Sequence, residues 1–171
     1  KMTRAFYVFI LSVLLIILNT TACKKDDKDV LNIISVEGNS MTEYNKDYIP
    51  EQGIFIPSTL WQCEGTMYRT FIQLALQPSA GLMFEIFTSS NTEQIPVGTF
   101  SLGSPCAEGF TAAFYPYSGS KTTGLCFSAG AITIEKDGDK YDIEMNLTIG
   151  DECGGGTMIG NFNGTLTESQ D

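Results

Sequence analysis

The amino-acid sequence predicts an all-β domain, an antiparallel meander of about 8–10 strands, behind an N-terminal export segment. After residue 30, apolar side chains alternate with polar ones, turn signals separate the alternating runs, and no stretch has a convincing helical period. Strands that follow one another with short connections usually pair as a meander. A closed barrel or a two-sheet β-sandwich would protect the edges of such a sheet.

Residues 1–22 are expected to be a type II signal peptide. The basic start, with Lys1 and Arg4, precedes an apolar run of 14 residues at positions 5–18, whereas a helix that spans a bilayer needs roughly 20. The small residues that follow end in Thr21, Ala22 and Cys23, and these three resemble the lipobox of bacterial prolipoproteins. Thr20 departs from that pattern, which commonly has Leu there. An ordinary secretory signal with an incidental cysteine is the simpler alternative.

Residues 23–29 are expected to be a lipidated cysteine, Cys23, followed by a charged tether. Residues 24–29 are all charged and therefore favour a solvated spacer. Within this run, Lys25, Asp26 and Asp27 resemble the acidic export signal of surface-exposed lipoproteins of Bacteroidota. The resemblance implies attachment to the outer membrane through the N-terminal lipid, exposed at the cell surface. An orientation toward the periplasm is the alternative.

Residues 30–171 have the length of a single β-domain and are strongly acidic, with 5 Lys or Arg against 17 Asp or Glu. This charge makes nucleic acid an unfavourable partner. The chain has no histidine, which excludes a Ser-His-Asp triad, a Cys-His pair and a His-ligated zinc site. Carboxylate or lysine chemistry remains open, so enzymes are disfavoured; we expect no cofactor and no metal.

Strands are expected in order along the chain wherever apolar residues recur at every second position. Positions 68, 70, 72, 74 and 76 share one face of a strand at 67–77, and residues 78–81 turn it into a strand at 82–88. Residues 40–48 have room for one helical turn. The remaining expected strands are 30–36, 95–102, 110–115, 125–129, 130–136, 141–149 and 158–167.

The strand pair 130–136 and 141–149 is expected to form a hairpin around Asp137 and Gly138, a dipeptide that favours tight turns. Odd-numbered apolar residues of the second strand alternate with polar residues, which indicates one buried and one solvated face. A turn at 137–138 places Ile134 opposite Tyr141 and extends the pairing to Cys126 opposite Ile149.

The four cysteines of the domain are expected to form two disulfides, because exported chains oxidise their thiols. Three pairings are possible. Counted along their strands in steps of two, Cys126 and Cys153 both fall at positions that face the buried side. This favours a Cys126–Cys153 bridge and leaves Cys63–Cys106 as the second. A Cys106–Cys126 bridge is nearly as favourable.

Three aromatic residues are candidates for ligand binding. Tyr115 and Tyr117 lie near an expected loop tip, where tyrosines can stack on sugars or anchor a protein partner, although packing under the loop is the simpler interpretation. Trp61 is the only tryptophan and lies beside Cys63. Packing against a disulfide is its simpler interpretation, and a ligand platform is the alternative.

Short motifs at 95–100, 131–134 and 159–166 resemble those of small uncharacterised lipoproteins of Bacteroidota with a lipocalin-like or sandwich domain. This resemblance implies lineage and compartment and no activity. The leading hypothesis is a non-catalytic surface lipoprotein that binds an extracellular glycan or protein. A lipocalin-like carrier of a small apolar ligand and a small hydrolase using a carboxylate pair are the alternatives.

Overall fold

The computed structural model describes residues 32–63, 65–116 and 124–169, which belong to one compact unit. Within them, no helix is long and apolar enough to span a membrane. The strands are β1 (Ile34–Glu37), β2 (Asp47–Cys63), β3 (Gly65–Gln77), β4 (Ala80–Thr88), β5 (Gly98–Ser101), β6 (Gly109–Pro116), β7 (Phe127–Asp137), β8 (Lys140–Ile149), β9 (Gly156–Gly164) and β10 (Leu166–Glu168), and η1 (Asp151–Cys153) is a single 3-10 turn.

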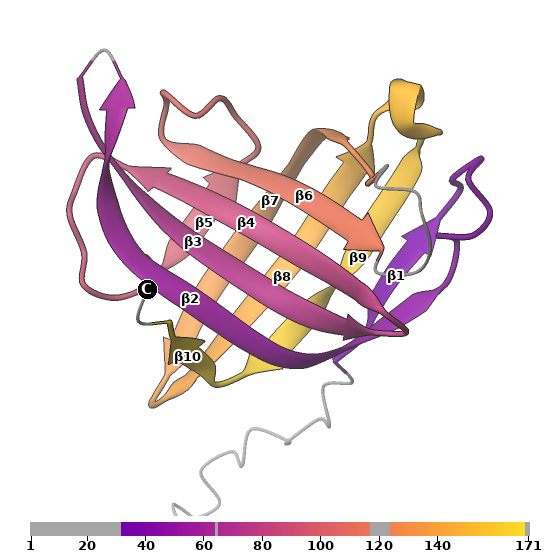
Figure 1. The fold of residues 1–171 in the computed structure, drawn as a ribbon, viewed down its shortest axis with the longest axis horizontal. Helices are drawn as coiled ribbons and strands as arrows, with labels where there is room; N and C mark the ends of the chain where they lie inside the picture. The colour runs from indigo at the N-terminus through magenta and orange to yellow at the C-terminus, as the bar shows by residue number, and fades with distance from the viewer. Residues whose placement is uncertain (1–31, 64, 117–123, 170–171) are drawn as a thin grey trace, which may run out of the picture. The chain divides into compact units, whose positions relative to one another are not determined.

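The strands form one sheet that is nearly closed into a barrel, as Figure 1 shows. The pairing order is β5-β7-β8-β9-β1-β2-β3-β4-β6, and every pair along it is antiparallel. An isolated bridge between Leu102 and Phe110 joins the two ends of this order, next to β5 and β6. The all-β, antiparallel prediction is therefore confirmed, and of its two architectures the molecule adopts the barrel.

The strand order differs from a simple meander at two places: β5 and β6 exchange positions, and the short β10 pairs in parallel with β2 outside the main order. β4 pairs with β6, whereas β5, which follows β4 in the chain, lies at the opposite end of the strand order and pairs with β7. The expected strand at 95–102 is regular only over Gly98–Ser101. Ile95 nevertheless is buried, at 3% exposure, which ties the crossing segment to the barrel interior.

The strand β2 was not expected from the sequence, and it is the longest element of the fold, with 17 residues. It contains Pro50, Gly53 and Pro57, which interrupt the alternation and usually mark turns or edges. Register shifts between Pro50 and Gln52 and between Ile56 and Thr59 absorb the two prolines in β-bulges. No helix forms at 40–48; a turn closed by the Tyr44 N–H donating to the Met41 carbonyl, at 3.0 Å, precedes β2 instead.

The register predicted for the β7–β8 hairpin was wrong by two residues. Asp137 pairs with Lys140, so the turn residues are Gly138, with a φ of 63°, and Asp139. This is the position that glycine takes in type II′ turns. Ile134 consequently lies opposite Ile143. A slip of two residues preserves the face on which each side chain lies, so the predicted buried face is correct.

A bulge changes the far end of the same hairpin. Phe127, and not Cys126, pairs with Ile149, because the register shifts between Phe127 and Ala129. The chain then bends back through η1, whose first turn follows Gly150. The Gly150 N–H donates to the Cys126 carbonyl at 2.9 Å, which holds the returning chain beside β7.

Two disulfides cross-link segments of the barrel that are distant in sequence. They are Cys63–Cys106, with a Cα–Cα distance of 5.5 Å, and Cys126–Cys153, at 5.7 Å. This is the pairing that the sequence favoured. The first bridge links the end of β2 to the segment before β6, and the second links the start of β7 to η1.

The barrel interior is packed with large apolar side chains. The Phe114 ring meets the rings of Tyr48, at a centroid distance of 5.1 Å, and Tyr44, at 5.9 Å, both edge to face. Burial raises the pKa of Tyr48 to about 12. The predicted inward faces of β3 and β4 are confirmed by six residues of at most 3% exposure: Ile72, Leu74, Leu76, Leu82, Phe84 and Ile86.

Candidate functional site

The two halves of the barrel differ in the side chains that they turn outward. On β8, the outward positions carry Asp142, Glu144, Asn146 and Thr148. The outward positions of β2, β3, β4 and β6 are mostly apolar, and we call this surface the outer apolar face: Ile54, Ile56, Trp61, Met67, Phe71, Ala75, Met83, Phe87, Ala113 and Tyr115. Ile54 and Tyr115 are exposed on this face, Met67 and Phe87 are buried, and the others are half-buried. Exposed apolar groups of this kind on an acidic domain can contact partners or ligands.

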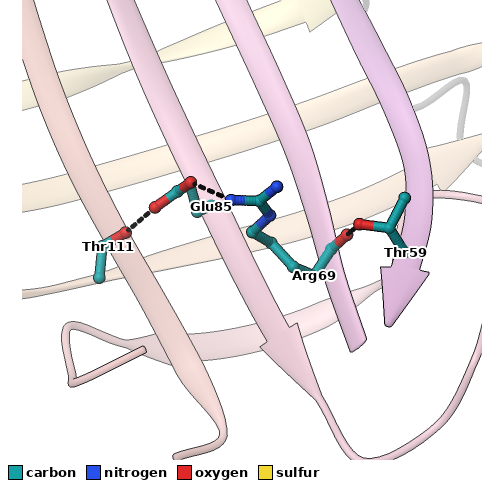
Figure 2. Close-up of polar contacts among 4 residues, drawn as sticks. All are labelled: Thr59, Arg69, Glu85 and Thr111. Carbon is teal, nitrogen blue, oxygen red and sulfur yellow. Dashed lines mark hydrogen bonds and ion pairs between the residues drawn. The ribbon is translucent and has the colours of Figure 1, made fainter. Parts of the chain in front are cut away.

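A chain of polar contacts crosses the outer apolar face from β2 to β6 (Figure 2). Arg69 Nη1 donates to Glu85 Oε1 at 3.1 Å, and Thr111 Oγ1 donates to Glu85 Oε2 at 3.0 Å. Thr59 Oγ1 makes a longer contact, 3.4 Å, with the Arg69 carbonyl. Arg69 and Glu85 are the only charged residues of β3, β4 and β6.

The pairing of β3 with β4 places Arg69 beside Glu85. Phe71 pairs with Glu85 and Arg69 pairs with Phe87, so Arg69 and Glu85 are diagonal neighbours on adjacent strands. Their side chains are 32% and 33% exposed. Solvent screens a pair at this depth, so its contribution to stability is about 0–1 kcal/mol. Its main effect is to fix the direction of the carboxylate and of the guanidinium.

Trp61 stands beside this pair. The Arg69 guanidinium lies over the Trp61 ring, 4.3 Å from its centroid, and the ring of Phe87 is 6.1 Å away. Phe87 is fully buried although it is not part of the main interior cluster, and Met67 is 9% exposed and also outside that cluster. A small second apolar cluster on the outside of the sheet therefore supports the tryptophan, which itself stays partly exposed.

The end of the face at Trp61 is tied down by two further contacts. The Cys63–Cys106 disulfide begins two residues after Trp61. Ser89, just after β4, donates to Glu108 Oε1 from its hydroxyl at 2.5 Å and from its N–H at 3.2 Å. These hydrogen bonds lower the pKa of the Glu108 carboxyl. Trp61 therefore lies on a part of the barrel that a disulfide and the Ser89–Glu108 hydrogen bonds restrain.

The structure separates the two described aromatic candidates. Tyr115 is 41% exposed and lies within β6, paired with Gly81, which in turn pairs with Ala75. Trp61 pairs with Met67, eight residues from Ala75 along β3. At about 3.3 Å per residue, the two rings are anchored roughly 26 Å apart along the strands. Tyr117 lies outside the described residues, as do Cys23, Lys25, Asp26 and Asp27.

Sequence reasoning missed Arg69, Glu85 and Thr111. A signal was present for two of them, because Arg69 and Glu85 are single charges at outward positions of otherwise uncharged strands. The turn at residues 78–79 pairs Leu76 with Ala80, and counting back from it makes Arg69 and Glu85 diagonal neighbours. Thr111 had no such signal, because β6 reaches β4 only through the exchange of β5 and β6.

The same side chains indicate what the site can do chemically. Within the described part of the chain, no Asp or Glu is buried, and no three potential metal ligands gather. The site offers an aromatic ring, a guanidinium, a carboxylate and hydroxyls on the outer side of neighbouring strands. These groups suit the binding of a polar ligand that has one apolar face.

Comparisons of the chain with protein-family models, curated proteins and solved structures give no match.

Proposed function

We propose that this protein is a non-catalytic, lipid-anchored binding protein of the outer membrane. Cys23 carries the anchor, and residues 25–27 direct the domain to the cell surface. The outer apolar face then binds an extracellular glycan at Trp61 and the Arg69–Glu85 pair. The observation that supports this most is the partly exposed tryptophan beside a hydrogen-bonding network fixed across four strands.

A glycan suits this combination of groups. Pyranose rings have an apolar C–H face that stacks on an aromatic ring, and their hydroxyls both donate and accept hydrogen bonds. Glu85 has free lone pairs that accept, Arg69 has further N–H groups that donate, and the Thr111 hydroxyl, whose proton goes to Glu85, accepts. Because protein contacts already orient these groups, little conformational entropy is lost when a ligand binds.

The two alternative functions have less support. A lipocalin-like carrier needs an unfilled apolar cavity, whereas aromatic rings contact one another inside this barrel. A hydrolase needs two carboxylates facing each other in a cleft. Glu135 and Asp142 are cross-strand neighbours on the outward side of β7 and β8, but Glu135 is exposed to solvent and Asp142 is half-buried beside Asn163, so they do not face each other across a cleft.

The proposal is tested with the full-length chain, purified in mild detergent with its disulfides intact, on a glycan array that also carries mucin and matrix proteins. We expect saturable binding to glycans that disappears in Trp61→Ala and is partly retained in Trp61→Phe. Ile159→Ala is the matched control, because Ile159 is a 49% exposed apolar residue on the opposite outer surface. Binding to matrix proteins alone would indicate a protein ligand, and binding that survives Trp61→Ala would refute this site.

Anchoring is tested separately. Metabolic labelling with a fatty-acid analogue should label the wild-type chain and leave Cys23→Ser unlabelled. Protease treatment of intact cells should digest the wild-type domain and spare a variant in which Lys25, Asp26 and Asp27 are replaced by alanine. Labelling of Cys23→Ser, or a domain that resists protease on intact cells, would contradict the anchor or the surface location respectively.

A further inference from the structure

We infer that the sugar bound at the outer apolar face is electrically neutral, without carboxylate, sulfate or amine groups at the contact. This inference rests on the proposed function and names the ligand class of the same site. It follows from the local charges, from the field of the whole domain and from the contacts that already occupy the Glu85 carboxylate.

Among the residues that the structure describes, the site has no net charge and no second cation. Arg69 is the only arginine after Arg4, and its guanidinium is committed to Glu85 at 3.1 Å and to the Trp61 ring at 4.3 Å. The described lysines lie on other parts of the barrel. Lys46 lies over the Tyr48 ring, and Lys136 donates to Gln94 Oε1 at 2.9 Å. An anionic sugar would therefore find no unpaired positive group here.

The field of the domain also opposes an anion. Residues 30–171 carry 17 acidic against 5 basic residues. Exposed charges farther apart than roughly 8 Å are largely screened at physiological ionic strength, so the repulsion at the site comes mainly from nearby carboxylates such as Glu85, and the net charge of the domain disfavours only the approach of an anion. A sialic acid, uronate or sulfate group would approach a negative domain and meet a carboxylate at the site itself.

A cationic sugar is disfavoured for a different reason. Both oxygens of Glu85 already accept hydrogen bonds, one from Arg69 and one from Thr111. An ammonium group that recruited Glu85 would compete with Arg69 and place two cations beside one carboxylate. A neutral hydroxyl adds to the network without changing the charge, because each carboxylate oxygen has a second lone pair.

The test uses matched glycans on the full-length protein: one neutral oligosaccharide series and the same series with a sialyl, a sulfate or a free amine group added. We expect the neutral forms to bind at least about tenfold more tightly than each charged form. Their affinity should change less than about twofold between about 20 mM and about 500 mM sodium chloride, because no charges pair across the interface.

A charge-changing variant makes the test sharper. Glu85→Gln keeps the size of the side chain and leaves Arg69 unpaired, so the ratio of sulfated to neutral affinity should rise by about fivefold or more. Glu144→Gln makes the same change in net charge on the exposed outer surface of β8 and should leave that ratio unchanged.

The outcomes separate the two proposals. Tight binding of a charged form that weakens with salt and is lost in Trp61→Ala would overturn neutrality and leave glycan binding in place. An unchanged affinity ratio in Glu85→Gln would show that Arg69 and Glu85 do not set the charge preference, and would overturn the inference. If no glycan of any charge binds, the proposed function fails together with the inference.

Discussion

Removing the Cys63–Cys106 disulfide should destabilise the barrel by an amount that follows from the chain length between the two cysteines. The bridge closes a segment with a sequence separation of 43, and the chain-entropy relation then gives roughly 4.0 kcal/mol at 25 °C. The same relation gives roughly 3.6 kcal/mol for Cys126–Cys153, whose separation is 27. Domains of this size are stable by about 5–15 kcal/mol, so each double serine variant should still fold.

The assay is urea unfolding of Cys63→Ser/Cys106→Ser and of Cys126→Ser/Cys153→Ser, followed by far-ultraviolet circular dichroism and by tryptophan fluorescence. Trp61 is the only tryptophan, and it lies two residues from Cys63. The first variant should therefore show altered native-state fluorescence and weaker glycan binding. The second variant should lose similar stability with native fluorescence and binding.

Two results would refute this reasoning. A loss below about 1 kcal/mol in the first variant would show that the bridge does not restrict the unfolded chain as its length implies. Equal changes of fluorescence in both variants would show that Cys63–Cys106 does not position Trp61. Non-reducing peptide mapping of the wild-type chain is the prior control, because free thiols at Cys63 or Cys106 would remove the premise.

Three further predictions concern the interior. Phe114→Ala should cost about 3–5 kcal/mol in urea unfolding, because Phe114 is fully buried, whereas Phe71→Ala on the outer apolar face should cost about 1 kcal/mol; equal losses would contradict the assigned faces. Burial raises the pKa of Tyr48 to about 12, so the stability that its neutral form contributes should be lost as pH rises from 10.0 through that value. In a spectrophotometric titration of tyrosine ionisation, Tyr48→Phe should remove the ionisation that occurs near pH 12. Gly53→Ala should cost about 1–3 kcal/mol, because its Cβ would meet Leu166 Cδ2, and a double-mutant cycle with Leu166→Ala should show less than additive losses.

Much of the fold could be predicted from local patterns. The alternation at 67–77 and 82–88 correctly assigned the buried faces of β3 and β4, and a turn at 78–79 joins them. The parity of Cys126 and Cys153 favoured the correct disulfide pairing. A two-residue error of register in the β7–β8 hairpin left the buried face intact, since side chains alternate with a period of two.

The candidate site could be predicted only in part. Trp61 was a candidate from the sequence as the only tryptophan, beside Cys63, although packing against a disulfide was the simpler interpretation. Its neighbours Arg69 and Glu85 come from two other strands, and Thr111 from a third. β2, which carries Trp61, was missed because Pro50 and Pro57 interrupt its alternation.

The sequence by itself determined the strand-rich build, the acidity, the inward faces of β3, β4, β7 and β8, and the favoured disulfides. These properties depend on residues that are close in sequence or on parity within one strand. Only the tertiary structure decided that β2 continues through two prolines, that β5 and β6 exchange places, and that Trp61, Arg69, Glu85 and Thr111 meet. The physical reason is that a strand's neighbours are chosen by the packing of the whole barrel, in which a bulge or a crossing segment costs less free energy than an unpaired edge or an unfilled interior.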